Sequence, residues 1–227
     1  MTTLTTAPVA PLLDRLFKDA EAAHPMHDPA FAAVSSEERL RLMRSRADYR
    51  HFYAQLKDYA LPVSRDTGRL LYMLARASGA RAIVEFGTSF GLSTLHLAAA
   101  LRDNGSDGGG GRLITTEFEP SKIARARDNL AAGGLSDLVE IREGDALETL
   151  ASGLPDTIDL LLLDGAKSLY REVLGLVESR LRAGAVIIAD NADHCPDYLE
   201  YVGEPGNGYL SMSFTDEVEL TIRLRSR

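Results

Sequence analysis

The stretch ARAIVEFGTSFGLSTLHLAAAL, residues 80–101, combines a short apolar run, a glycine-containing turn and a helix-like segment. Two later runs, LLLL at 160–163 and VIIA at 186–189, resemble its IVEF in being apolar on both faces. Strands of this kind are typical of a parallel sheet that is covered by helices on each side. The stretch therefore predicts one strand–turn–helix unit of an α/β fold.

Strand and helix patterns alternate along much of the remaining chain. The tail from 209 to 224 contains two alternating runs around TDE with no helix between them, which predicts an antiparallel hairpin. We therefore predict an α/β fold with a doubly wound, Rossmann-like sheet of seven mostly parallel strands, a C-terminal antiparallel hairpin and helices on both faces. The other predicted strands cover 80–87, 112–117, 138–143, 158–164 and 184–190, and the clearest helices between them cover 66–80 and 120–134.

Residues 1–60 are predicted to form a helical extension that precedes the main domain, residues 61–227. Ser36 is the expected N-cap of a long second helix, because acidic Glu37 and Glu38 follow it in the first turn. We expect the extension to cover the functional site as a lid or to contribute to a homodimer interface.

Composition narrows the classes of function. The chain has 227 residues, of which 45% are hydrophobic, and it carries 33 acidic against 25 basic side chains, a net charge of −8. This balance excludes wholesale disorder and disfavours a nucleic-acid partner. No apolar run approaches the roughly 18 residues that span a bilayer, no signal peptide is evident, and Cys195 is the single cysteine. We expect a cytoplasmic protein without membrane segments, with a flexible surface loop at 104–111.

The glycine turn at 85–94 is the first candidate site. Glycines allow a ligand to approach the backbone, and free N–H groups at the start of the following helix favour a negative group. Gly87 and Gly91 are four residues apart, so the turn lacks the G-x-G-x-x-G pattern of pyrophosphate-binding loops. A plain tight turn is the alternative interpretation.

Acidic residues follow the next two strands. Glu117 ends a strand, where a carboxylate can accept both hydroxyls of a ribose, and Glu119 competes for this role. A solvated acid at the end of a strand is the alternative. Asp145 follows the third strand and could accept from an adenine amino group, cap a helix, or do both.

Two further strands end in carboxylates, at Asp164 and Asp190, and Asn191 follows the second. Because carboxyl ends of parallel strands open onto one crevice, these groups can converge. Two carboxylates and an amide oxygen are hard ligands suited to Mg²⁺, and Lys167 would lie beside them. Helix capping combined with surface charge is the alternative.

Residues 61–224 resemble the cation-dependent, S-adenosylmethionine-dependent O-methyltransferases, the group that contains catechol and caffeoyl-CoA O-methyltransferases. EFGTSFGLS resembles their cofactor turn, DGAKSLY their D-x-x-K-x-x-Y motif, and ADN the end of their metal site. TTEFEP resembles the strand whose first Glu binds the cofactor ribose, which favours Glu117 over Glu119. The resemblance implies that 61–227 is a methyltransferase domain. It would transfer a methyl group from S-adenosylmethionine to a small catechol-type, vicinal dihydroxy aromatic acceptor with help from a divalent cation.

The resemblance also implies roles for individual residues. Asp164, Asp190 and Asn191 would bind Mg²⁺ or another divalent cation, and Lys167 would be the catalytic base. The residues expected to contact the cofactor are Val63, Glu85, Gly87, Ser89, Ser93, Glu117, Asp145, Ala146 and Asp164.

The chain departs from the family pattern where the family recognises its acceptors. Ala166 stands where the animal catechol enzymes carry a Trp, and the chain contains no Trp. The stretch GYLSMS before the final turn has no counterpart of their substrate-anchoring Glu. The chemistry therefore carries over from the family, and the identity of the acceptor does not.

The expected reaction sets a requirement on Lys167. A phenol has a pKa of about 10, so its ionisation at pH 7 takes roughly 4 kcal/mol. A divalent cation can supply much of this as a Lewis acid. A lysine acts as a base only when its pKa falls below its usual value, and burial beside a dication acts in that direction.

Alternative functions share parts of the pattern. A metal-independent small-molecule O-methyltransferase or a tRNA hydroxyuridine methyltransferase would use the same cofactor crevice, although the net charge of −8 counts against the tRNA enzyme. An NAD-dependent oxidoreductase would share the strand–helix alternation but would need the dinucleotide turn that is missing.

Other polar residues are interpreted as structural. His96 and Cys195 are expected to be packed, and Lys122, Arg125 and Arg127 are expected to form a solvated helix face.

Overall fold

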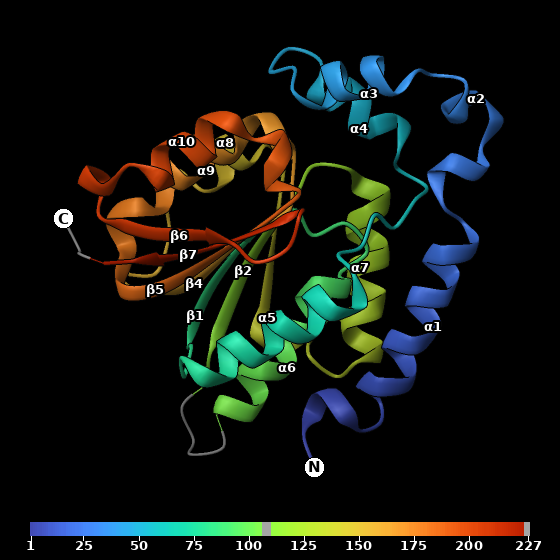
Figure 1. Ribbon diagram of the computed structural model, residues 1–227. Helices are drawn as coiled ribbons and strands as arrows, with labels where there is room; N and C mark the ends of the chain where they lie inside the picture. The colour runs from blue at the N-terminus through green and yellow to red at the C-terminus, as the bar shows by residue number, and fades with distance from the viewer. Residues whose placement is uncertain (106–109, 225–227) are drawn as a thin grey trace.

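The computed structural model describes residues 1–105 and 110–224. Within these ranges, seven strands form one sheet in the order β3-β2-β1-β4-β5-β7-β6 (Figure 1). The first five strands are mutually parallel, and β7 pairs antiparallel with both β5 and β6. The predicted sheet and its hairpin are therefore confirmed. The strands are β1 Ala82–Phe86, β2 Arg112–Glu117, β3 Val139–Glu143, β4 Ile158–Leu163, β5 Leu181–Asp190, β6 Tyr209–Ser213 and β7 Val218–Arg223.

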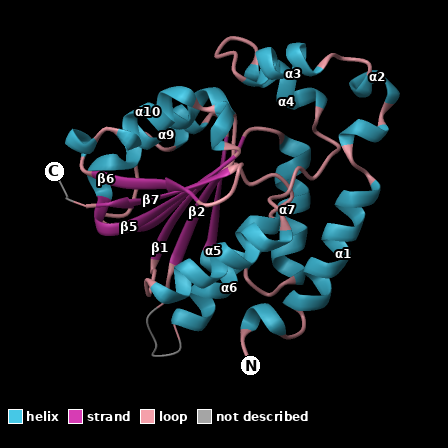
Figure 2. Ribbon diagram, viewed as in Figure 1, coloured by secondary structure: helices cyan, strands magenta, loops and turns pink. Residues whose placement is uncertain are grey.

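Helices cover both faces of the sheet, as Figure 2 shows. Neighbouring strand residues point to opposite faces, so Ile83 packs in one apolar core with Leu71 and Leu95, whereas Val84 packs in the other with Tyr170. This explains why the strands are apolar on both faces. One face carries α5 Arg65–Ala77, α6 Leu92–Asn104 and α7 Pro120–Ala132, and the other carries α8 Ala146–Thr149, α9 Tyr170–Val177 and α10 Pro196–Gly203.

The N-terminal extension is helical but more broken than predicted. It contains α1 Val9–Ala22, α2 Pro29–Ala32, α3 Ser36–Met43 and α4 Tyr49–Gln55. The predicted long second helix is wrong because α3 and α4 are separate. Between them the Ser45 hydroxyl donates to the Asp48 carboxylate at 2.9 Å and accepts from the Asp48 N–H at 3.1 Å. Such local side-chain bonds compete with the helical ladder.

The start of α3 also needs a correction. The N-cap is Ser35, whose side chain accepts from the Glu38 N–H at 3.1 Å, and not Ser36. Glu37 and Glu38 lie in the first turn as expected. The predicted loop 104–111 falls partly outside the described residues, and no described helix is long and apolar enough to cross a membrane.

The turn after β1 fixes the crevice at the carboxyl ends of the strands. Gly87 has φ +104°, and a Cβ there would lie 2.5 Å from the Asp164 carbonyl oxygen. Only glycine lets the backbone pass this close to the end of β4. The first turn and the Asp164 strand end therefore lie side by side.

Candidate active site

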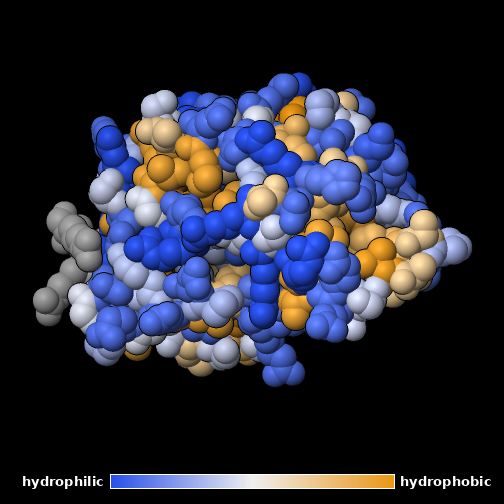
Figure 3. All heavy atoms as spheres, turned by 90° about the horizontal axis from the view of Figure 1, so that it is seen from above, coloured by the Kyte–Doolittle hydropathy of each residue, from blue (hydrophilic) through white to orange (hydrophobic). Residues whose placement is uncertain are grey.

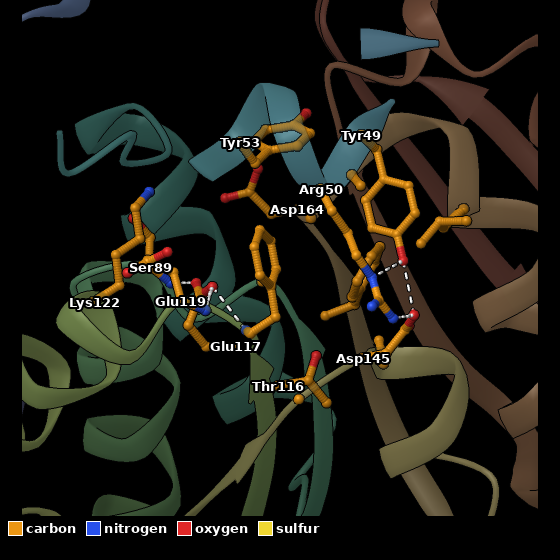
Figure 4. A pocket seen from close by; sticks show the side chains of 18 of the residues that line it. Tyr49, Arg50, Tyr53, Ser89, Thr116, Glu117, Glu119, Lys122, Asp145 and Asp164 are labelled. Carbon is orange, nitrogen blue, oxygen red and sulfur yellow. Dashed lines mark hydrogen bonds and ion pairs between the residues drawn. The ribbon is translucent and has the colours of Figure 1, made fainter. Parts of the chain in front are cut away.

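Two adjoining pockets open at the carboxyl ends of the strands. The first, here the strand-end pocket, lies over β1, β2 and β4 (Figure 4). The second, here the N-terminal pocket, lies between the strand ends and the N-terminal extension and has a volume of about 720 Å³. Tyr53, Leu61, Asp164 and Gly165 line both pockets, so the two are neighbours.

The residues predicted to contact the cofactor lie in the two pockets or buried behind them. Val63 lines the N-terminal pocket. Glu85 and Ser93 are not among the described lining residues and lie buried behind the glycine turn. The strand-end pocket is lined by the other six, Gly87, Ser89, Glu117, Asp145, Ala146 and Asp164.

Glu117 is held rigidly at the end of β2. Its carboxylate accepts from the backbone N–H groups of Phe118 at 2.9 Å, Glu119 at 3.0 Å and Ser89 at 2.9 Å. Burial raises the pKa of Glu117, and these hydrogen bonds oppose the rise. The Glu119 carboxylate also lines the pocket, but it accepts from the hydroxyl of Ser121 at 3.0 Å and caps α7. Of the two candidates, Glu117 has the fixed position.

The prediction that Lys122 lies on a solvated helix face is wrong. Its side chain is only 4% exposed, and its ammonium group donates to the Ser89 hydroxyl at 3.3 Å (Figure 4). Burial lowers the pKa of Lys122, and the nearby Glu117 carboxylate opposes this. Lys122 precedes the buried Ala126 by four residues, so both lie on the inner face of α7. This spacing is the sequence signal that could have predicted the burial of Lys122.

Helix capping, one of the two roles predicted for Asp145, is confirmed. One oxygen of its carboxylate accepts from the Leu147 N–H at 2.9 Å at the start of α8. The other oxygen accepts from the Tyr49 hydroxyl at 2.8 Å and from the Arg50 guanidinium (Figure 4). Tyr49 and Arg50 belong to α4, so the N-terminal extension reaches the strand-end pocket. The sequence had not indicated either residue, because this contact joins parts of the chain that are 95 or more residues apart.

The Asp164–Lys167–Asp190 cluster lies where β4 and β5 end. The buried Lys167 ammonium donates to the Asp164 carboxylate at 3.2 Å, to the Tyr170 hydroxyl at 2.8 Å and to the Asp190 carbonyl at 3.2 Å. Asn191 follows in a left-handed conformation with φ +51°. Lys167, Asp190 and Asn191 line the N-terminal pocket together with Asp164. The sequence thus correctly placed these four residues in one crevice.

The electrostatics of this cluster differ from the expectation for Lys167. Burial is the largest single effect and acts to lower its pKa, but the combined charge interactions with Asp164, Tyr53, Asp190 and Cys195 outweigh it, so the pKa of Lys167 is raised. Burial also raises the pKa of Asp164, and burial together with the Asp164 charge raises the pKa of Asp190 to about 7. The Lys167 ammonium is thus paired with the Asp164 carboxylate and bonded to the Asp190 backbone carbonyl, and the Asp190 carboxylate lies close enough for its pKa to respond to both charges.

Comparisons with known proteins agree with this geometry. Residues 84–192 match a family model described as a methyltransferase domain. The protein is 25% identical to a cofactor-bound protein from MTB, with a TM-score of 0.69 over 98% of this chain and 94% of that chain. It is 28% identical to the O-methyltransferase TomG from Streptomyces achromogenes, solved in complex with SAM, with a TM-score of 0.61 over 85% of this chain and 92% of that chain.

Two catechol O-methyltransferases have a higher sequence identity to this chain than these two structures do. Catechol O-methyltransferase from Niastella koreensis is 36% identical over 135 residues, which are 58% of each chain. Catechol O-methyltransferase B from Danio rerio is 32% identical over 178 residues, 74% of this chain and 64% of that protein. The chain contains a methyltransferase domain and is similar to the class I S-adenosylmethionine-dependent O-methyltransferases. It spans less than two thirds of the length of these curated relatives.

The side chains at the ends of β4 and β5 can be compared with the ligands that a divalent cation needs. Among the described residues, no group of three or more His, Cys, Asp or Glu side chains could hold a metal ion. The candidate set of Asp164, Asp190 and Asn191 instead combines two carboxylates with an amide, and all three line the N-terminal pocket. Carboxylate and amide oxygens are the ligands that Mg²⁺ takes in proteins. The residues present therefore fit a hard divalent cation.

Glu85 supports the glycine turn from beneath. It is fully buried and accepts from the Ser93 and Thr94 hydroxyls, both at 2.6 Å. Burial raises the pKa of Glu85 to about 7. In the folded protein this carboxyl group keeps its proton over a pH range in which the unfolded chain has lost it.

Glu85→Gln is therefore expected to remove part of the pH dependence of stability. Between pH 4.5 and 7 the unfolded wild type binds fewer protons at this group than the folded protein does, so its stability falls as pH rises. With a folded pKa of about 7, the loss amounts to about 3 kcal/mol. Urea unfolding of both proteins at pH 5 and pH 8 measures it. An equal loss of stability in wild type and variant would contradict the assignment to Glu85.

Proposed function

We propose that the protein transfers the methyl group of S-adenosylmethionine to a hydroxyl of a catechol-type, vicinal dihydroxy aromatic acceptor, with assistance from a divalent metal. The observation that carries the proposal is that Asp164 lies in the wall of both pockets. A cofactor in the strand-end pocket and an acceptor in the N-terminal pocket would thus meet at the Asp164–Lys167–Asp190 cluster. The catechol O-methyltransferase relatives support the choice of acceptor.

The strand-end pocket, with a volume of about 70 Å³, would hold the adenosine end of the cofactor, and the methionine end would reach the N-terminal pocket at Val63. Glu117, fixed by three backbone N–H groups, would accept from the ribose hydroxyls. Asp145 would lie near the adenine, and Gly87 and Ser89 would let the backbone approach the cofactor closely. Ser93 and Glu85 would support the turn at the methionine end.

Asp164, Asp190 and Asn191 would hold the divalent cation, preferably Mg²⁺. When bound, the cation would act as a Lewis acid that favours ionisation of the acceptor hydroxyls. Two neighbouring oxygens on the acceptor suit such a site, which would select vicinal diols.

Lys167 would remove the acceptor proton at its Nζ atom as a neutral amine, once its ammonium group has released a proton to solvent. Its ammonium group is held by Asp164, Tyr170 and the Asp190 carbonyl, so its position is set before the acceptor arrives. A cation held by Asp164 and Asp190 would offset negative charge that raises the pKa of Lys167 and would so favour the neutral amine. Holding cofactor and acceptor in line would contribute much of the acceleration.

Calorimetry tests the cofactor and separates the alternatives. We expect S-adenosylmethionine to bind and NAD to give no heat of binding, because the glycine turn lacks the dinucleotide pattern. Binding of NAD alone would instead favour an oxidoreductase. Transfer to a tRNA substrate but to no small phenol would favour the hydroxyuridine enzyme.

We also propose a homodimer to which the N-terminal extension contributes. The apolar side chains of the extension that suggested it, such as Leu12, Phe17 and Phe52, are buried within the single chain. The proposal therefore rests on the resemblance to enzymes of this family. Multi-angle light scattering should report about twice the chain mass of 24.7 kDa. A monomer at assay concentration would end this proposal.

A further inference from the structure

The N-terminal pocket is large for a single catechol ring. Its volume of about 720 Å³ falls within the roughly 300–1,000 Å³ of sites that enclose drug-sized ligands. The polar cluster of Asp164, Lys167, Asp190 and Asn191 contributes to only one part of its wall. The methionine end of the cofactor would occupy the part beside Val63, and a single ring with its diol at the polar cluster would still leave the part beside the extension unfilled.

The rest of the wall is mainly apolar and comes from the N-terminal extension and the segment that follows it. Phe52 is 3% exposed and packs on Tyr53, with ring centroids 5.2 Å apart, and on Phe31, with centroids 6.3 Å apart. Met43 and Met26 add unbranched side chains that adapt to different shapes. The apolar side chains of the extension that line the pocket include Phe17, Met26, Phe31, Met43, Phe52 and Leu56.

The charges of the pocket disfavour a polyanionic acceptor. The lysine and arginine side chains among its described lining residues are Arg39, Arg65 and Lys167, and each is already engaged. Arg39 donates to the Val34 carbonyl at 2.7 Å, and Arg65 donates to the Asp14 carboxylate at 3.1 Å. Lys167 is paired with Asp164. Arg39 alone of these three described side chains is not paired with a carboxylate, and the described lining residues also include four acidic side chains, Glu21, Asp66, Asp164 and Asp190. The balance of charge therefore disfavours phosphate groups.

Figure 3 views the molecule from the side of α3 and α4. Hydrophobic side chains come to this surface in separate groups among hydrophilic ones. Met26, which lines the pocket, is itself 42% exposed, so the apolar wall continues to solvent at this residue. An acceptor with an apolar substituent could therefore extend along the extension from the polar cluster.

We infer that the N-terminal pocket takes an uncharged aromatic diol that carries a bulky apolar substituent, with the diol at the polar cluster and the substituent against the extension. This inference rests on the proposed function for the diol end. It adds that the extension sets acceptor size, and that neither a bare catechol nor a coenzyme A ester is the preferred acceptor.

The test compares three acceptors with the same diol: catechol, 4-phenylcatechol and caffeoyl-coenzyme A. Burying the added ring should raise kcat/KM for 4-phenylcatechol over that for catechol by about tenfold to a hundredfold. Caffeoyl-coenzyme A should fall below 4-phenylcatechol. Equal values for catechol and 4-phenylcatechol, or a preference for the coenzyme A ester, would overturn the inference.

A variant pair localises the effect. Met43→Trp fills the pocket and should lower kcat/KM for 4-phenylcatechol at least tenfold while changing that for catechol less than threefold. Met73→Trp is the matched control, because Met73 is 63% exposed on α5 and is absent from the described pocket lining. Equal effects of Met43→Trp on both acceptors would contradict the assignment of the substituent to this wall.

Calorimetric titration with catechol and 4-phenylcatechol separates this inference from the proposed function. Tighter binding of 4-phenylcatechol with no methyl transfer to any acceptor would refute the function and support the pocket assignment. Methyl transfer with equal binding of the two diols would do the reverse.

Discussion

Lys167→Ala is expected to lower kcat about 10²- to 10⁴-fold, the usual contribution of a positioned general base. The buried ammonium group of Lys167 lies between Asp164 and Asp190. Among the described residues that line the N-terminal pocket there is no other lysine. Steady-state kinetics with a catechol-type acceptor measure the effect. The affinity for S-adenosylmethionine should change less than about threefold, because Lys167 does not line the strand-end pocket.

The control for this variant must separate catalysis from stability. Removing Lys167 leaves the Asp164 carboxylate without its ammonium partner and takes one hydrogen bond from the Asp190 carbonyl, so the thermal midpoint should fall. Tyr170→Phe removes one hydrogen bond from Lys167 but retains the ammonium group, and it should lower kcat much less. A Lys167→Ala protein that is folded, binds S-adenosylmethionine and keeps full kcat would rule out the base.

Glu117→Ala should weaken S-adenosylmethionine binding by about 2–4 kcal/mol, or roughly 30- to 1,000-fold in Kd, because two charge-assisted hydrogen bonds to the ribose are lost. Isothermal calorimetry on the variant and the wild type gives the two constants. Glu117→Gln, which keeps an oxygen acceptor for the surrounding N–H groups, should show an intermediate loss.

Glu119→Ala is the matched control for Glu117. Glu119 lies two residues away and also lines the pocket, but its carboxylate caps α7 through Ser121. Its loss should destabilise the helix by about 1 kcal/mol and leave the cofactor constant almost unchanged. If Glu119→Ala weakens cofactor binding and Glu117→Ala does not, the ribose contact belongs to Glu119.

The sheet could be predicted because a short stretch of sequence is enough to identify each of its strands. Strands such as β4, with Leu160, Leu161, Leu162 and Leu163 all fully buried, are apolar on both faces, and this pattern alone indicates a covered parallel sheet. The grouping of Asp164 with Asp190 followed from the same rule, because parallel strands end at one edge.

The features that the sequence did not reveal depend on distant contacts. Tyr49 and Arg50 reach Asp145 only because α4 folds back over the strand ends. Lys122 looked like part of a charged helix face, yet the inner side of α7 places it against Ser89. The break between α3 and α4 arises from the Ser45–Asp48 turn, which competes with a helical pattern that is otherwise continuous.

Metal-assisted methyl transfer can be tested in a single assay. The protein is incubated with methyl-labelled S-adenosylmethionine and 4-phenylcatechol in Mg²⁺, in EDTA, and in EDTA followed by excess Mg²⁺. We expect labelled O-methyl product to form with Mg²⁺, to be lost in EDTA and to form again when Mg²⁺ is restored. Full transfer in EDTA would contradict the metal assignment, and no transfer to this or any other catechol under any of the three conditions would contradict the function itself.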